Sequence, residues 1–135
     1  MPGSHKLGGS PQIDLTLPLL DEIYQKGVER VPAEACGVLL VHPRFRDNLR
    51  SQVVELPNRS MTPHDSYDLH TSDIRLELST WIEMHSREEV EAMAIWHTHP
   101  AGNIGPSSRD MRSRLEGIAY LVVAITEAGP VPTWF

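Results

Sequence analysis

The spacing of apolar residues predicts two amphipathic helices. From Leu17 to Arg30 apolar side chains recur every three or four residues, which is the period of a helix with one buried face. Pro32 follows, and a proline ends such a pattern. A second helix is predicted from Thr71, because one face collects Ile74, Leu78, Trp81, Ile82 and His85.

Short apolar runs predict the strands. Two runs, Cys36 to His42 and Gln52 to Leu56, flank a polar turn that contains Pro43 and Asn48, which predicts a hairpin. Residues 91–99 alternate instead, and this period of two places on one side Met93, Ile95, His97 and His99, and on the other Ala92, Ala94 and Trp96. The run Ile118 to Ile125 predicts a core strand, and a last strand is expected near the end of the sequence.

This order of elements predicts an α+β or α/β sandwich with a mixed sheet. No internal repeat is present. We expect residues 1–12 to be a flexible N-terminal segment or an expression scar, and residues 13–135 to form a single domain. A chain of 135 residues with 40% hydrophobic and 22% charged content is large enough for one core.

Composition narrows the function classes. The net charge of −6, from 12 basic and 18 acidic residues, argues against nucleic acid as a partner, because such binding needs a cationic surface. The longest apolar run has eight residues, well short of the ~20 that a membrane-spanning helix requires. With one cysteine and no apolar signal segment near Met1, we expect a cytoplasmic protein without a disulfide.

Candidate chemistry lies between residues 95 and 110. His97 and His99 are two residues apart, so on a strand they project to the same face, and Asp110 follows after a loop with two prolines and two glycines (residues 100–106). A catalytic zinc ion takes three such protein ligands and leaves a fourth position for water. The segment therefore predicts one Zn²⁺ with a bound water, held by His97, His99 and Asp110.

Each half of this pattern also has a simpler interpretation. Ser107 and Asp110 are spaced as in a helix capping box, and Ser107 precedes a predicted helix from Ser108 to Leu115. A His-x-His pair alone is often a polar surface feature. Together and in this order, the two halves favour a metal site.

Metal-assisted hydrolysis also needs a proton carrier near the ion. Glu34 directly precedes the apolar run that begins at Cys36, so it is placed at the entrance of a buried strand. The alternative for Glu34 is a solvated acid at a turn, and no periodicity separates it cleanly from the other acidic residues Glu22, Glu29 and Glu55.

The set Glu34-x-Cys36-Gly37, His97-x-His99-Pro100 and Ser107-x-x-Asp110 resembles the JAMM motif of the JAB/MPN-domain metallopeptidases, over about residues 32–126. The resemblance implies a cytidine-deaminase-like sandwich, in which a curved mixed sheet is flanked by helices. It also implies zinc ligands at His97, His99 and Asp110, a general acid/base at Glu34, and an oxyanion donor at Ser107.

The implied activity is hydrolysis of a peptide or isopeptide bond, often at the C-terminal tail of a ubiquitin-like or sulfur-carrier protein. Short intervals between the motif parts leave little room for long substrate-gripping insertions, so we expect a bacterial, archaeal or phage-encoded type. Alternatives are a peptidase for phage tail assembly or cell walls, and a metal-free scaffold.

Other residues receive structural interpretations, with named alternatives. Cys36 lies in an apolar run, which favours a buried thiol over a nucleophile. Trp81, Trp96 and Trp134 are expected to be packing anchors, although Trp96 next to His97 leaves a substrate contact open. His64, His70 and His85 are expected to be structural or surface residues, and an irregular segment carries three candidate rim residues, Asn58, His64 and Tyr67.

Overall fold

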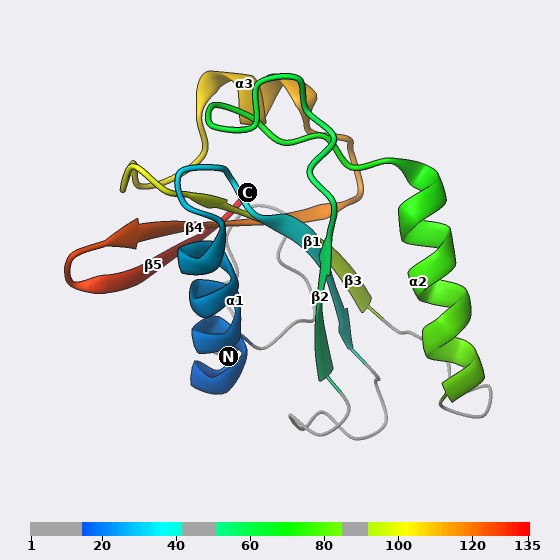
Figure 1. The fold of residues 1–135 in the computed structure, drawn as a ribbon. Coiled ribbons are helices and arrows are strands. Elements are labelled where there is room, and N and C mark those ends of the chain that lie inside the picture. Colours follow the sequence, from blue (N-terminus) through cyan, green and yellow to red (C-terminus); the bar gives the residue numbers. More distant parts are fainter. Residues whose placement is uncertain (1–14, 42–50, 85–91) are drawn as a thin grey trace.

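The computed structural model describes residues 15–41, 51–84 and 92–135 (Figure 1). Within these ranges the helices are α1 (Leu17–Arg30), α2 (Thr71–Met84) and α3 (Ser108–Ser113). The strands are β1 (Cys36–Val41), β2 (Ser51–Leu56), β3 (Ala92–His99), β4 (Ala119–Thr126) and β5 (Gly129–Trp134). The predicted order of elements is confirmed, and the predicted bounds of α1 are reproduced.

Several predictions fall outside the described part of the chain. They concern residues 1–12, His42, the turn with Pro43 and Asn48, His85 and Glu91, together with the side chains of Trp81, Ile82 and Ala92.

One mixed sheet connects all five strands in the order β2-β1-β3-β4-β5. The predicted hairpin is confirmed, since β1 and β2 are antiparallel. Strand β3 is antiparallel to β1 and parallel to β4, and β5 returns antiparallel to β4. The histidine strand β3 is thus the third of the five strands and lies at the centre of the sheet.

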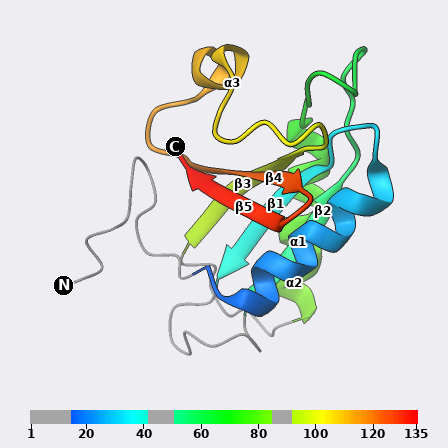
Figure 2. The same cartoon turned by 90° about the vertical axis from the view of Figure 1, so that its left-hand side faces the viewer.

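Helix α1 covers one face of the sheet (Figures 1 and 2). It begins at Leu17 after the N-cap residue Thr16, whose side chain caps the first turn, and Pro18 suits the first turn because it has no N–H to satisfy. Gly27 lets the helix approach closely, because a Cβ there would lie 2.7 Å from the Ile125 side chain. The core below α1 is continuous and includes Ile23, Leu39, Trp96, Leu121 and Val123.

Helix α2 lies on the opposite face of the sheet (Figure 1). Its predicted apolar stripe is confirmed for Ile74 and Leu78, which pack with Val38 and Leu40. The strand alternation is also confirmed, because Ile95 packs in this second cluster while Trp96 packs in the first. Both faces of the sheet are therefore covered, which makes three layers.

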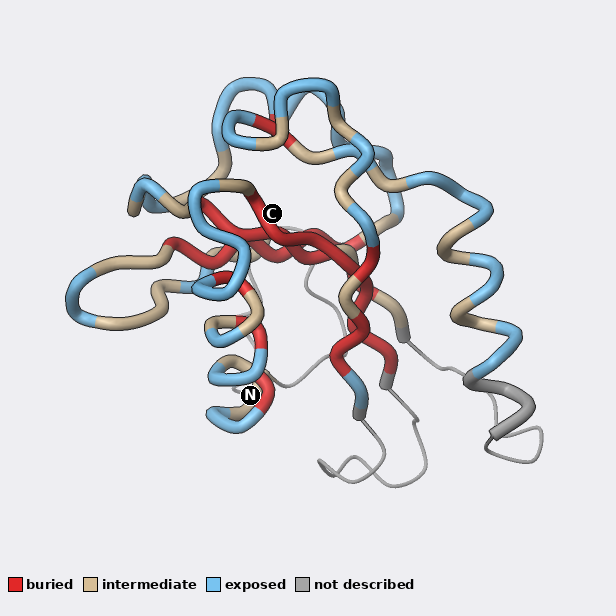
Figure 3. Tube along the Cα trace, viewed as in Figure 1, coloured by how far each residue is buried: buried red, intermediate tan, exposed pale blue. Residues whose placement is uncertain are grey.

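The loop that follows β2, residues 57–68, and helix α3 lie together beyond one end of the sheet (Figure 1). Most of their backbone is exposed or half-buried, in contrast to the buried strands beneath (Figure 3). In the described residues, no helix has the length and apolar character needed to cross a membrane. The architecture is α+β, as predicted.

Candidate metal site

Strand pairing brings Glu34 to the two histidines. Cys36 lies opposite His97 in the antiparallel pair of β1 and β3, and continuing that register by two residues places Glu34 beside His99. Two hydrogen bonds extend the pairing, from Thr98 N to Ala35 O and from Ala35 N to the Thr98 hydroxyl, each 2.9 Å long. Thr98, which lies between the two histidines, therefore fixes the position of Ala35 just before β1.

His97 and His99 are buried, with 0% and 7% of their surface exposed. This excludes the interpretation of the pair as polar surface residues. Burial lowers the pKa of His97 despite its bond to Asp110, so this imidazole stays neutral at neutral pH. Neutral imidazole is the form that binds a metal ion.

Asp110 meets both histidines from the first turn of α3. One of its oxygens, Oδ2, lies 3.1 Å from Nε2 of His97 and 3.1 Å from Nε2 of His99. Burial opposes ionisation of Asp110, but the hydrogen bonds from the two histidines prevail and lower its pKa below the usual range. The loop from 100 to 106 thus brings the carboxylate back to the histidine strand, as predicted.

The capping box at the start of α3 is also present. The Ser107 hydroxyl accepts a hydrogen bond from Asp110 N at 3.0 Å, and Ser107 N donates to Asp110 Oδ2 at 2.9 Å. The capping interpretation of Ser107 is therefore confirmed. The capping role leaves the Ser107 hydroxyl able to donate a hydrogen bond, because a hydroxyl that accepts one bond keeps its own proton.

Glu34 is buried, with 6% of its surface exposed, so the alternative of a solvated acid is wrong. Its backbone is held on both sides, since its N–H donates to Pro63 O at 2.7 Å and its carbonyl accepts from Asn58 Nδ2 at 3.0 Å. Burial is the main cause that raises the pKa of Glu34 to about 7. A carboxyl group with this pKa can both take and give a proton at neutral pH.

Two ligand sets for a metal ion share the histidine pair. Ligand atoms of Glu34, His97 and His99 lie within 4.8 Å of one another, so these three residues could hold an ion. Asp110 is the other carboxylate, and its Oδ2 lies 3.1 Å from Nε2 of each histidine. The donor chemistry, two imidazoles with a carboxylate, suits zinc in either case.

Glu34 lines a hollow of about 490 Å³ together with Arg30 and Glu55, and two further hollows border the site. One, of about 290 Å³, is lined by Glu34, His99 and Ser107 together with the 100–106 loop. The other, of about 380 Å³, lies between α2 and α3 and is lined by Tyr67, Asp110 and mainly apolar side chains.

The structure also tests the alternatives for nearby residues. Cys36 is fully buried, and burial raises the pKa of its thiol to about 12, so it is unsuited to act as a nucleophile. Trp96 is fully buried and donates to Val38 O at 3.2 Å, which excludes a substrate contact and confirms a packing anchor. Trp134 packs against the core below α1, as expected.

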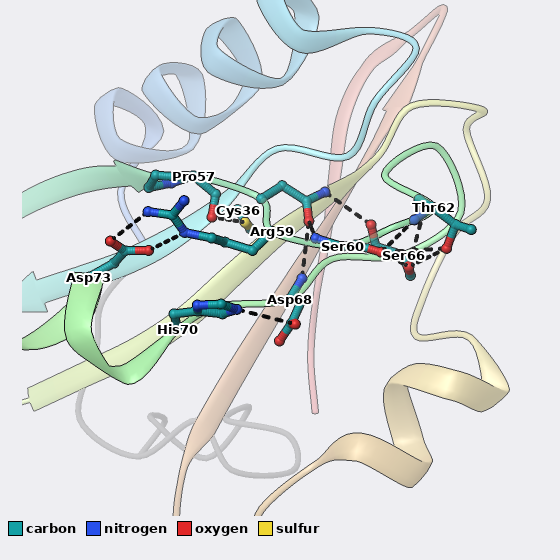
Figure 4. Close-up of polar contacts among 10 residues, drawn as sticks. Cys36, Pro57, Arg59, Ser60, Thr62, Ser66, Asp68, His70 and Asp73 are labelled. Atoms are coloured by element: carbon teal, nitrogen blue, oxygen red, sulfur yellow. Dashed lines mark hydrogen bonds and ion pairs between the residues drawn. The ribbon is translucent and has the colours of Figure 1, made fainter.

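Of the three candidate rim residues, His64 is exposed and lines the hollow beside Glu34. His70 is exposed as well and faces Asp68 (Figure 4). Asn58 is structural, because its amide bonds to the backbone of Glu34, Ser66 and Asp68. Tyr67 does more than expected, because its ring stacks on His97, with centroids 4.2 Å apart.

Sequence reasoning gave no role to two further partners of the histidines, Asn103 and Phe135, and neither stands in a recognisable pattern.

The fold and the buried cluster define a small α+β domain with a candidate site for a catalytic metal ion. The chain belongs to the prokaryotic homologues of the JAB domain, whose family pattern matches residues 16–135. This confirms the resemblance to JAB/MPN-domain proteins.

Two solved structures share this fold. Protein DSY2949 from Desulfitobacterium hafniense is 26% identical, with a TM-score of 0.64 over 89% of this chain and 80% of its own. A protein from Salinibacter ruber, 21% identical, has a TM-score of 0.52 over 88% of this chain and 78% of its own, and supports the fold. No curated protein matches the sequence significantly.

Proposed function

We propose that the protein is a zinc-dependent metallopeptidase that hydrolyses a peptide or isopeptide bond. The observation that carries the proposal is the convergence of two buried histidines on one aspartate oxygen, 3.1 Å from each, beside a buried glutamate. A merely structural ion pair would not require the second, unpartnered carboxyl of Glu34, whose Oε1 is buried without a hydrogen bond among the described residues.

We assign the ligand role to His97, His99 and Asp110. Asp110 is the better third ligand because ligands must be deprotonated, and its geometry is fixed by the capping box. When bound there, zinc would supply Lewis-acid polarisation of the scissile carbonyl and would lower the pKa of water to about 7.

The remaining groups then have separate tasks. Glu34 accepts a proton from the attacking water while the water oxygen bonds to the carbonyl carbon. Glu34 then passes that proton to the leaving nitrogen when the C–N bond breaks. Ser107, which lines the same hollow as Glu34, donates a hydrogen bond from its hydroxyl to the oxyanion. The backbone bond from Ser107 to Asp110 couples this donor to the ligand.

The proposed substrate is the C-terminal tail of a ubiquitin-like or sulfur-carrier protein. One hollow borders Glu34, His99 and Ser107 and another borders Tyr67 and Asp110, which leaves room beside the site for an extended chain. Extended peptides commonly bind through backbone groups, which suits a flexible tail better than a folded surface.

The experiment is zinc-dependent cleavage of a panel, namely ubiquitin-like proteins with a C-terminal extension and cell-wall peptides. We expect cleavage of the tail fusions, abolished by chelation, with kcat reduced about 10²–10⁴-fold in Glu34→Gln. Glu29→Gln, which changes an exposed acid of α1, is the matched control and should act like the wild type.

Each other outcome has a defined meaning. Cleavage of cell-wall peptides alone would replace the proposed substrate by that of a cell-wall peptidase. A protein that binds no zinc and cleaves nothing in the panel would favour the metal-free scaffold. Full activity of Glu34→Gln would reject the proton-carrier role.

A further inference from the structure

The two histidines differ in what orients their rings. Nδ1 of His99 lies 3.0 Å from Asn103 O, so this ring has the hydrogen bond that usually fixes the orientation of a metal-binding histidine. Nδ1 of His97 is buried and has no hydrogen-bond partner among the described residues. The fully buried His97 therefore needs another means of orientation.

Two aromatic rings orient the imidazole of His97. Tyr67 is stacked on His97, with ring centroids 4.2 Å apart and an interplanar angle of 22°. Phe135 meets His97 edge-on, at 6.2 Å and 86°. Stacked and edge-on contacts restrain the plane of a ring in two directions, although they use no polar atom.

Tyr67 is itself held firmly, because one amide ties down both of its neighbours in the chain. Asn58 Nδ2 donates to Ser66 O at 3.0 Å, and Asn58 Oδ1 accepts from Asp68 N at 3.1 Å. Hydroxyl contacts among Ser60, Thr62 and Ser66 close the same loop (Figure 4).

The same amide reaches the other side of the site. Asn58 Nδ2 also donates to the carbonyl of Glu34 at 3.0 Å. The position of Tyr67 relative to Glu34 is thus set by one side chain, so the stacked ring is part of a rigid frame around the histidines.

We propose that Tyr67 is a positioning residue that sets the plane of the His97 imidazole for metal binding, in place of the usual hydrogen bond. The inference rests on the proposed metal site but not on the proposed reaction. It requires the ring of Tyr67 and not its hydroxyl, which separates it from a catalytic role for the phenol.

The test is the zinc dissociation constant of three variants, measured by competition with a chelating dye. Tyr67→Phe keeps the ring and should bind zinc within about twofold of the wild type. Tyr67→Leu removes the ring and should weaken zinc binding about 10-fold or more, the loss typical of a removed orienting partner. Tyr24→Leu, a half-buried tyrosine of α1, is the matched control and should leave zinc binding unchanged.

Thermal unfolding of the zinc-free variants separates orientation from general stability. If Tyr67→Leu lowers the melting temperature yet binds zinc like the wild type, the ring is only packing and the proposal is overturned. A tenfold loss in Tyr67→Phe would also overturn it, because the hydroxyl would then carry the effect.

A measurement on the unchanged protein guards against a variant that fails to fold. Nuclear Overhauser contacts between the ring protons of Tyr67 and His97 are expected in the zinc-loaded protein, and their absence would contradict the proposal. Zinc binding without peptidase activity would refute the proposed function and leave this inference intact.

Discussion

The two faces of β3 carry opposite kinds of residue along the same eight positions. Toward α1 the strand presents Ala94, Trp96 and Thr98, all fully buried in the continuous core or against it. Toward α2 it presents Ile95, which packs with half-buried side chains, and then the two histidines. Residues on one face thus serve packing alone, while the other face carries packing residues first and then the candidate metal ligands.

The two faces of β3 therefore contribute to different properties, one to stability and the other to metal binding and turnover. The core below α1 gains from apolar burial, so changes there should alter the free energy of unfolding. The site end of the other face is assembled from polar groups of β3, α3, the 57–68 loop and the two residues before β1, Glu34 and Ala35. Changes there should alter metal binding and turnover first.

The largest stability effect should follow from Trp96→Ala. Removing this fully buried ring also removes the bond to Val38 O, and we expect a loss of about 3–5 kcal/mol in the free energy of unfolding. The neighbouring Ile95→Ala, on the half-buried face, should cost about 2 kcal/mol. Urea denaturation of the zinc-free proteins measures both, and equal losses would contradict the contrast between the faces.

Ser107→Ala should affect turnover more than stability. Loss of an oxyanion donor lowers kcat about 10²–10³-fold, equivalent to roughly 2.7–4 kcal/mol, whereas loss of a helix cap costs about 1 kcal/mol of stability. Thr16→Ala removes the cap of α1 and is the matched control, with a similar stability loss and no change in kcat. Similar small effects of both variants on kcat would show that Ser107 is only a cap.

The smallest effect on activity is expected from changes at Cys36, by alkylation or by substitution with alanine. Because burial raises its pKa to about 12 from 9.0, the native thiol has about a thousandfold less thiolate than an ordinary one. Iodoacetamide at pH 8 should modify the unfolded protein and leave the native protein unmodified, as mass spectrometry can show. Rapid labelling of the native protein, or loss of activity in Cys36→Ala, would revive thiol chemistry.

Local patterns were sufficient to predict the elements of the fold. The alternation in β3 is a property of consecutive residues and appears with the predicted faces. The helix α1 was also predicted, but its buried face consists of Leu19, Ile23 and Gly27, whereas the apolar Val28 is exposed. The hairpin of β1 and β2 followed from two runs with a polar turn. The order of the strands in the sheet was not predicted, because the pairing of β1 with β3 joins residues about 60 positions apart.

The candidate site shows the same limit. His97, His99 and Asp110 could be grouped by spacing, and Glu34 by its place before a strand and by the resemblance. Tyr67 and Phe135 could not, because a ring contact across 30 or more residues leaves no spacing in the sequence. Asn58 was equally silent, since an asparagine in an irregular segment has many interpretations.

The most direct test of the account is the zinc content of the purified protein, measured together with the zinc dissociation constants of Asp110→Asn and Glu34→Gln. We predict one tightly bound zinc ion per chain, lost in Asp110→Asn and retained in Glu34→Gln. Retention in Asp110→Asn with loss in Glu34→Gln would exchange the roles of the two carboxylates. A wild-type protein that binds no stoichiometric zinc would contradict the account at its centre.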